Sequence, residues 1–193
     1  MIKQIAKGHR SVVYLTKFKN KKVVKKVEKE NIYAINRINN EVYWLKKLSK
    51  LKICPKLYSF GNNYLIEEFI DGDRIISYLE NIDNPLKIII EILEQCRILD
   101  KLNIDKKEMT NPYKHIIVRK NKPIMIDFER AKFSLKPSNV TCFFSFLTSG
   151  KISNILKEKK ISFDKEKLKL LLQNYKKSYS NEDFSKLIVF INK

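Results

Sequence analysis

Hydrophobic and polar side chains alternate over residues 1–27 of the chain. Residues 12–17 place every second side chain on the opposite face of a strand, and a turn at Asn20-Lys21-Lys22 leads into the apolar pair Val23-Val24. A period of two is typical of strands whose two faces meet different surroundings. The pattern predicts antiparallel strands in this part of the chain.

After residue 38 the period lengthens to that of a helix. Val42, Leu45 and Leu48 recur at near-helical intervals, which predicts a helix over Asn39–Leu51 that ends before Cys54-Pro55.

A predicted hairpin follows, with strands Lys56–Phe60 and Tyr64–Ile70 joined across Gly61-Asn62-Asn63. The next break, Asp71-Gly72-Asp73, is the best candidate for a hinge between two lobes.

The rest of the chain reads as mainly helical. A helix from Asn84-Pro85 to Leu102 carries a buried stripe of Ile89, Leu93, Cys96, Leu99 and Leu102. A loop over Asn103–Lys114 leads to two short strands, His115–Val118 and Pro123–Asp127, joined by residues 119–122. Near the C-terminus, an apolar stripe of Leu168, Leu171, Leu172 and Tyr175 is followed by Ser180-Asn181-Glu182-Asp183, which resembles a capping box. The expected fold class is α+β: one domain over residues 1–193, with an antiparallel-sheet lobe over 1–70 and a mainly helical lobe over 71–193.

Composition bounds the class of protein. The chain has 193 residues and is 44% hydrophobic, enough to bury a core. Cys54, Cys96 and Cys142 are scattered and contain no CxxC spacing, which argues against a disulfide framework and against a zinc site. No apolar run approaches the ~18 residues of a membrane span, and the N-terminus lacks the apolar core of a signal peptide. We therefore expect a cytoplasmic protein with no membrane partner.

The charge is strongly basic, with 40 Lys+Arg against 21 Asp+Glu and a net charge of +19. A positive field of this size suits polyanions, so RNA or a ribonucleoprotein is a candidate partner. The alternative is a compositional bias, because Lys, Ile and Asn are abundant throughout the chain. The sequence does not indicate an oligomeric state.

Two segments in the strand region contain candidate phosphate-binding groups. Gly8, Ser11 and Val13 belong to a short segment between two predicted strands, where glycine permits close approach of the backbone to phosphates and Ser11 can hydrogen-bond them. The alternative is an ordinary turn. On the following strand, alternation puts Lys25 on one face and Lys26 on the other. Both lysines could instead be solvated.

Carboxylates follow at three places. Glu41 lies on the predicted helix, where it could orient a strand lysine or simply face solvent near the helix N-terminus. Glu67 and Phe69 lie at the end of a predicted strand whose backbone could hydrogen-bond a nucleotide base. Asp127 ends an apolar strand and precedes Phe128, a position where a charge needs compensation, for example by Mg²⁺. The alternative is a cap for the segment that begins at Arg130.

Together these segments resemble the protein-kinase superfamily. The likeness is greatest to its minimal atypical members: the RIO kinases, the lone kinase of the KEOPS complex and related predicted serine/threonine kinases of archaea. Gly8–Tyr14, Val23-Val24-Lys25, Glu41, residues 66–72 and residues 125–129 follow the family order within about residues 5–135. The resemblance implies a bilobal kinase-like fold with ATP between the lobes. It implies that Lys25 points inward to the phosphates, that Glu41 orients Lys25, and that Asp127 holds Mg²⁺.

The catalytic loop departs from the family pattern. If residues 116–118 form the strand after the loop, His115 takes the place of the family's metal-binding Asn, and Glu108 replaces the catalytic Asp. Glu108 and His115 are then seven residues apart where the family has five. Asp105 is a second candidate base, with Asn111 as its metal-ligand partner, and Lys107 could contact the transferred phosphoryl group.

Three functions compete on this basis. The first is an ATP- and Mg²⁺-dependent serine/threonine protein kinase with an unidentified protein substrate. The second is a nucleotide-binding pseudokinase or ATPase-like switch in an RNA or ribonucleoprotein assembly, which the altered loop favours. The third is a small-molecule phosphotransferase, which the short lysine-rich C-terminal part disfavours.

Overall fold

The computed structural model describes residues 2–8, 11–29 and 36–192 of the 193. The chain divides into two compact units. The first unit comprises Met1–Gly72 and Ile124–Ala131, and the second comprises Asp73–Pro123 and Lys132–Lys193. The first division falls within Asp71-Gly72-Asp73, and the expected split differs from the observed one in residues 124–131, which belong to the first unit.

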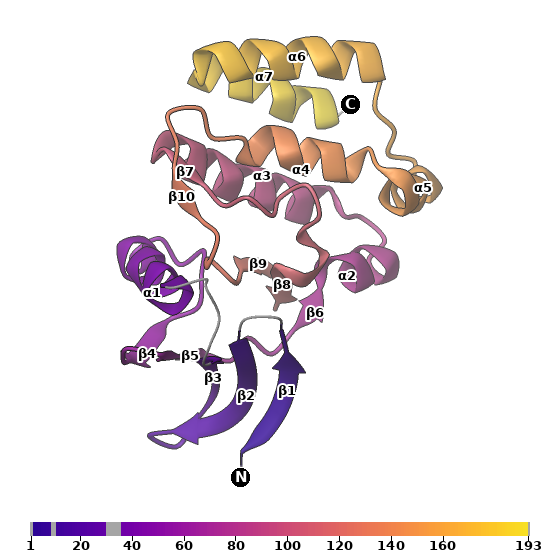
Figure 1. Cartoon of the computed structure of the whole chain (residues 1–193). Helices are drawn as coiled ribbons and strands as arrows, with labels where there is room; N and C mark the ends of the chain where they lie inside the picture. The colour runs from indigo at the N-terminus through magenta and orange to yellow at the C-terminus, as the bar shows by residue number, and fades with distance from the viewer. Residues whose placement is uncertain (1, 9–10, 30–35, 193) are drawn as a thin grey trace. The chain divides into compact units, whose positions relative to one another are not determined.

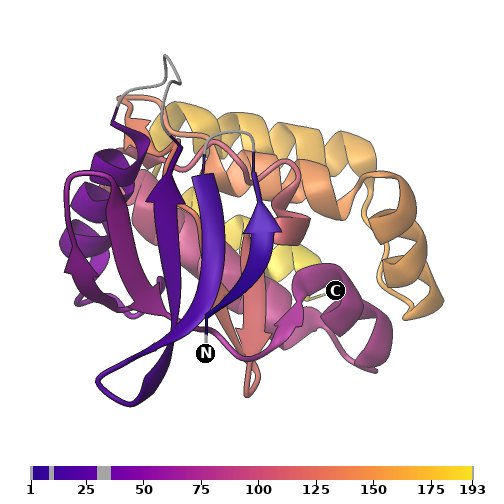
Figure 2. The ribbon, with the colours of Figure 1, turned by 60° about the horizontal axis from the view of Figure 1, so that its bottom comes forward.

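The first unit is built on an antiparallel five-stranded sheet in the order β1-β2-β3-β5-β4 (Figures 1 and 2). Its strands, in chain order, are β1 (Lys3–Lys7), β2 (Ser11–Phe18), β3 (Lys21–Glu28), β4 (Leu57–Phe60) and β5 (Tyr64–Glu68). The predicted strand region and the predicted hairpin are both confirmed. The predicted α+β class is also confirmed, because this sheet occurs together with seven α-helices among the described residues.

Local backbone chemistry explains the tight turns. Lys19 and Asn20, which join β2 to β3, have φ angles of 47° and 61°. Two consecutive positive φ values suit a two-residue hairpin turn, and asparagine tolerates this region better than most residues. Lys120 and Asn121 form a second two-residue turn of the same kind, between residues 119 and 122, with φ angles of 50° and 59°. At Gly61 a side chain would collide with the ring of Tyr64, so this turn requires glycine.

One helix, α1 (Arg37–Leu48), packs on β3, β4 and β5 of the first unit. Ile38 and Val42 of α1 pack with Leu65 of β5, and Leu57 of β4 packs against this cluster. The predicted helix is confirmed, but it begins and ends two or three residues earlier than its hydrophobic pattern suggested. Helix α1 thus covers one face of the sheet. The side chains of β3 and β5 that point to this face are buried against the helix.

The second unit is mainly helical. Its helices are α2 (Ile75–Asn81), α3 (Leu86–Lys101), a short 3₁₀ helix η1 (Pro112–Lys114), α4 (Asn139–Leu147), α5 (Gly150–Glu158), α6 (Lys165–Ser178) and α7 (Asn181–Ile191). Its strands are short: β6 (Asp73–Arg74) and β8 (Ile116–Arg119) form a sheet with β9 (Lys122–Met125), and β7 (Ile104–Asp105) pairs with β10 (Lys132–Phe133). The chain passes back into the first unit within β9.

Packing in the second unit centres on α3. The predicted stripe is buried at Ile89, Leu93, Cys96 and Leu99, each 0% exposed. The prediction is wrong for Leu102, which is 40% exposed because α3 ends at Lys101 and Leu102 is its C-cap. Helix α4 packs on α3, and α6 packs on α7.

The expected cap at the start of α7 is confirmed. Ser180 is the N-cap residue, and its Oγ accepts a hydrogen bond of 3.0 Å from the backbone N–H of Asp183. In a full capping box the backbone N–H of the N-cap residue would donate to the side chain of Asp183. Here the N–H of Ser180 donates to Ser178 Oγ instead. Among the described residues, no helix is both long and apolar enough to span a membrane.

Candidate functional site

A buried ion pair joins the sheet and the helix of the first unit. Lys26 Nζ on β3 lies 2.6 Å from Glu41 Oε1 on α1, with 12% of the lysine side chain and 1% of the glutamate side chain exposed. Lys26 Nζ also lies 3.2 Å from Glu67 Oε1 on β5. Burial alone would lower the pKa of Lys26, but the charges of Glu41, Glu67 and Asp127 outweigh it and hold the pKa well above its ordinary value.

The expected inward orientation of Lys25 is wrong. Lys26 lies opposite Leu65 in the β3–β5 ladder, and Leu65 faces α1, so Lys26 also faces α1. Lys25 lies on the other face of the sheet, where its Nζ is 5.1 Å from the centre of the Tyr64 ring. The missed signal was in the pattern itself. The kinase third-strand motif Val-Ala-Ile-Lys places its lysine three residues after the first valine, which is position 26.

Glu41 connects this ion pair to the segment that contains Asp127. Its Oε1 accepts a hydrogen bond of 3.1 Å from the backbone N–H of Phe128. Two other α1 side chains hold the same segment: Asn40 donates to the carbonyl oxygens of Glu129 and Ala131, and Trp44 Nε1 donates to the Ala131 carbonyl at 2.8 Å. Helix α1 therefore fixes residues 128–131 by hydrogen bonds to their backbone.

Asp127 is held in an unusual backbone conformation. Its φ is 63°, in the left-handed region that few residues other than glycine adopt. Its carboxylate is half-buried, and its negative charge helps to raise the pKa of Lys26. Burial raises the pKa of the neighbouring Glu129, and the charge of Asp127 raises it further.

Glu67, which was expected to contribute through its backbone to nucleotide binding, contributes a buried side chain to this cluster. It is 3% exposed, and within the described residues its Oε2 has no hydrogen-bond partner. Burial raises the pKa of Glu67 from 4.5 to about 7, although Lys26 opposes the shift. Lys26 therefore contacts the carboxylates of Glu41 and Glu67 and also feels the charge of Asp127.

Asp127 is the expected ligand for a divalent cation in this cluster. Mg²⁺ prefers oxygen ligands and is commonly held by one or two protein carboxylates plus phosphates and water. The carboxylate of Asp127 could supply one such oxygen ligand. Among the residues that the structure describes, no three His, Cys, Asp or Glu side chains gather into a complete metal site. A metal at Asp127 would therefore need ligands from a nucleotide or from water.

The other expected nucleotide-binding residues are placed as follows. The N–H of Gly8 donates to the carbonyl oxygen of Ser11 at 2.9 Å, while His9 and Arg10 of this loop lie outside the described residues. A side chain at Gly8 would meet the Ser11 oxygen at 3.4 Å, an ordinary contact, so the loop does not demand glycine here. Val13 is half-buried on β2, and the Phe69 ring lies 4.2 Å from Lys22 Nζ.

The expected catalytic loop belongs to the second unit. Glu108 Oε2 lies 3.4 Å from Lys106 Nζ and 3.7 Å from His115 Nδ1. Lys106 is fully buried. These contacts favour a role for His115 in positioning Glu108, because imidazole is a poor ligand for Mg²⁺ compared with oxygen donors. Asp127 and His115, the two expected metal ligands, belong to different units.

Asp105 shapes the same loop. Its Oδ1 accepts a hydrogen bond of 3.0 Å from the N–H of Lys107, and its Oδ2 pairs with Lys107 Nζ at 2.9 Å. Lys107 has a φ of 75°, so these bonds stabilise a tight turn. Asn111 is exposed, and its N–H donates to the Glu108 carbonyl. Asp105 and Glu108 each pair with a lysine of this loop, so both remain candidates for the catalytic acid.

A buried polar network that the sequence analysis missed supports the loop. Asn139, at the start of α4, accepts from the N–H of Lys106 at 2.9 Å and donates to Asp100 Oδ1 at 2.7 Å. Tyr175 donates to Asp100 Oδ2 at 2.8 Å, and Arg97 donates to Tyr175. Burial raises the pKa of Asp100, and the hydrogen bonds from Tyr175 and Asn139 oppose the shift.

Comparison with known proteins does not extend these observations. No known family profile matches the chain, and no curated protein matches it significantly.

Proposed function

We propose that this chain is an ATP- and Mg²⁺-dependent phosphotransferase of the atypical serine/threonine protein-kinase type. The observation that carries the proposal is the buried Lys26–Glu41 pair, with Glu41 also bonded to the backbone of the Asp127-Phe128 segment. A lysine oriented by a helix glutamate and placed beside an aspartate is the arrangement that kinases use for nucleotide phosphates and metal.

Each residue then has a distinct task. Lys26 would bind the phosphates of ATP, Glu41 would orient Lys26, and Asp127 would hold Mg²⁺. The metal would neutralise charge on the phosphates. Glu108 would orient or deprotonate the acceptor hydroxyl, with Lys106 and His115 holding its carboxylate in place. Such catalysis rests on positioning and on charge neutralisation.

The test is transfer of the γ-phosphate from labelled ATP with Mg²⁺, scoring autophosphorylation and a generic basic protein. Asp127→Ala and Glu108→Gln would be compared with Asp83→Ala and Glu94→Gln, which change exposed acids of the second unit that have no assigned role. We expect transfer in the parent and in both controls, and a loss of at least about a hundredfold in each site variant. Absence of both transfer and Mg²⁺-dependent ATP binding would refute the proposal.

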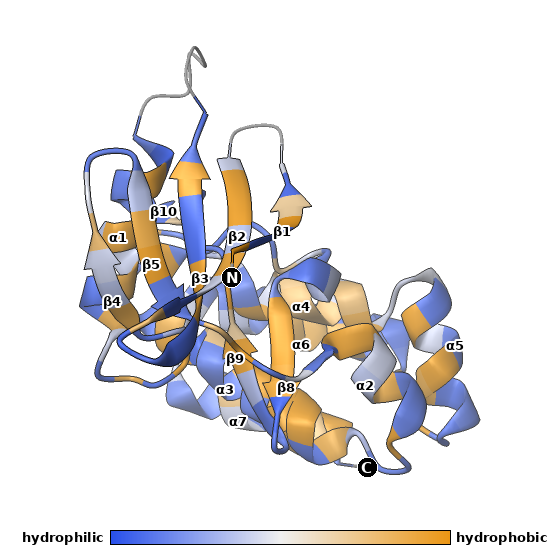
Figure 3. Cartoon of the chain, turned by 90° about the horizontal axis from the view of Figure 1, so that it is seen from below, coloured by the Kyte–Doolittle hydropathy of each residue, from blue (hydrophilic) through white to orange (hydrophobic). Residues whose placement is uncertain are grey.

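A second candidate function has an observation of its own. Near the β2–β3 hairpin, lysines lie over two aromatic rings whose centres are 6.4 Å apart, a group that we call the lysine–aromatic surface: Phe18 with Lys19, and Tyr58 with Lys21 and Lys56. The end of the β2–β3 hairpin that carries these lysines is strongly hydrophilic (Figure 3). Stacking rings among cations suit single-stranded RNA, which supports a nucleotide-binding switch that acts on RNA.

RNA binding distinguishes this second function. Fluorescence anisotropy with a labelled single-stranded RNA should show affinity that falls steeply with salt. Lys19→Glu combined with Lys21→Glu should weaken binding far more than Lys101→Glu combined with Lys177→Glu, two exposed lysines of the second unit. Equal losses of RNA affinity in the two double variants would mean that only the net charge matters. That result would refute specific RNA binding at the lysine–aromatic surface.

A further inference from the structure

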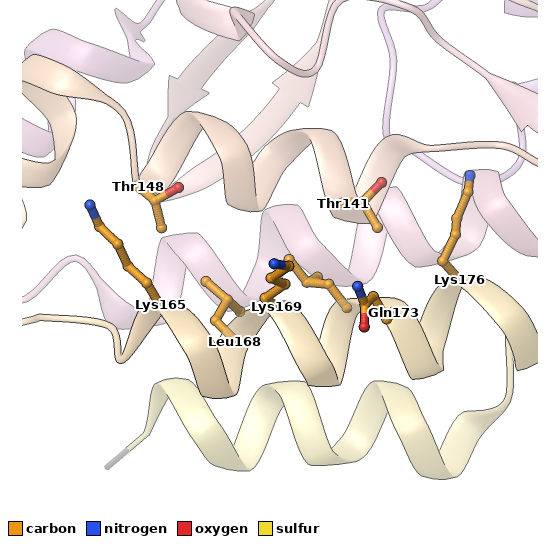
Figure 4. Close-up of a pocket in the computed structure, with 8 residues that line it drawn as sticks. Thr141, Thr148, Lys165, Leu168, Lys169, Gln173 and Lys176 are labelled. Carbon is orange, nitrogen blue, oxygen red and sulfur yellow. The ribbon is translucent and has the colours of Figure 1, made fainter.

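A groove lies between α4 and α6 in the second unit, and no role has been assigned to it so far. Its volume is about 540 Å³, within the range of ligand-binding pockets. Thr141 and Thr148 line it from the side of α4, and Lys165, Leu168, Lys169, Leu172, Gln173 and Lys176 line it from α6 (Figure 4).

The floor of the groove is apolar. Leu168 is 4% exposed, and Leu172 is half-buried one turn further along α6. The hydroxyl of Thr141 donates to the Ser138 carbonyl, and that of Thr148 donates to the Phe144 carbonyl. Because these hydroxyls are bonded to the backbone, the methyl groups of both threonines are left to face α6 (Figure 4).

The rim of the groove is cationic, and none of the described residues that line it is acidic. Lys176 is already used, since its Nζ donates to the carbonyl oxygens of Lys136 and Pro137 and to Ser138 Oγ. Lys165 and Lys169 are exposed, and in the part of the chain that the structure describes neither ammonium group has an ion-pair partner.

Lys165 and Lys169 are also neighbours on one face of α6. Residues four apart on a helix are adjacent, and like charges at that spacing destabilise the helix. An anionic group bound between them would relieve this repulsion. The groove therefore combines an apolar floor with a rim that lacks its counter-charge.

The dimensions favour a linear ligand. The lining residues of α6 run from Lys165 to Lys176, which at 1.5 Å per residue is roughly 17 Å. That length accommodates about five residues of extended chain or three turns of helix. A cavity of about 70 Å³ shares Thr148 and Lys165 with the groove and is also lined by Leu156 and Lys157 of α5. The combination of apolar and cationic side chains therefore continues toward α5.

We propose that the α4–α6 groove is a docking site for an acidic amphipathic segment of a partner protein. An apolar side chain of the segment lies over Leu168 and Leu172, and its carboxylates pair with Lys165 and Lys169. This site is independent of the proposed phosphotransferase activity, because none of the residues assigned to that activity lines the groove.

The test is fluorescence anisotropy, without ATP, with a labelled synthetic peptide that carries leucines and glutamates at helical spacing. A second peptide replaces its leucines by alanine. Lys165→Glu combined with Lys169→Glu removes the cationic rim, and Lys167→Glu combined with Lys177→Glu makes the same charge change at exposed positions of α6 outside the groove. Circular dichroism checks that both variants are folded.

We expect the parent and the Lys167/Lys177 variant to bind the leucine peptide alike, the Lys165/Lys169 variant to bind at least about tenfold more weakly, and the alanine peptide to bind poorly. Chemical-shift changes on binding should include the methyl groups of Thr141, Thr148, Leu168 and Leu172. Three results would overturn the proposal: no binding to the parent, equal weakening in both double variants, or displacement of the peptide by single-stranded RNA or anionic lipid vesicles as readily as by unlabelled peptide.

Discussion

Replacing Glu67 by glutamine should remove most of the pH dependence that this side chain imposes on stability. Glu67 is buried on β5, with Oε1 3.2 Å from Lys26 Nζ. Glutamine has the same shape and keeps a carbonyl oxygen that can accept from Lys26, but it carries no charge. Comparing parent and variant therefore isolates the ionisation of one carboxylate.

The magnitude follows from the pKa of Glu67, which burial raises from 4.5 to about 7. At 1.36 kcal/mol for each pH unit, the difference corresponds to about 3 kcal/mol. Because the folded state binds the proton more tightly than the unfolded state, this stabilisation is fully present below pH 4.5 and is lost as pH rises through about 7. Between pH 5 and 8 the parent should lose roughly 2–3 kcal/mol of unfolding free energy relative to Glu67→Gln.

Urea unfolding at a series of pH values, followed by circular dichroism, measures this difference directly. Glu94→Gln changes an exposed glutamate of α3, and its free energy of unfolding should depend on pH in the same way as that of the parent. A constant difference between the parent and Glu67→Gln from pH 5 to 8 would show that Glu67 ionises normally. The idea that Lys26 cannot neutralise all of its carboxylate neighbours would then be refuted.

Three further predictions concern other parts of the molecule. Lys26→Met should weaken ATP binding, measured by isothermal titration calorimetry, by at least about tenfold, while Lys25→Met should change it little; equal effects would contradict the assignment of Lys26. Tyr175→Phe removes the hydroxyl bonded to Asp100 and Arg97, and should lower the free energy of unfolding by about 1–3 kcal/mol in urea titrations. Ser180→Ala removes the N-cap of α7, and should cost about 1 kcal/mol by the same measurement, whereas Ser180→Gly should cost less. An unchanged midpoint in either variant would contradict the corresponding hydrogen bond.

The two groups of candidate residues differ in how they are held. Lys26, Glu41 and Asp127 are held within the first unit by a buried ion pair and by hydrogen bonds from α1 to the backbone. Glu108 is held within the second unit by Lys106 and His115, on a loop that Asn139 anchors. Each group thus has its own structural support, so variants in one unit can be interpreted without disrupting the other.

Local pattern predicted most of the secondary structure. The alternation over residues 1–27, the Gly61-Asn62-Asn63 turn and the helical stripe of α3 all appear in the structure, because strand period, turn chemistry and helix period depend on neighbours in sequence. The errors occur at ends. Leu102 continues the stripe but lies beyond the last turn of α3 and is 40% exposed.

The sequence by itself determined that a lysine-bearing strand, a glutamate-bearing helix and the Asp127-Phe128 segment exist in that order. Only the tertiary structure decided that Lys26 rather than Lys25 meets Glu41, because alternation defines two faces without saying which one a distant helix covers. The same holds for Glu67 and for the network of Asp100, Asn139 and Tyr175. Their partners lie many residues away, and burial beside those partners, not local sequence, shifts their pKa values and gives them their roles.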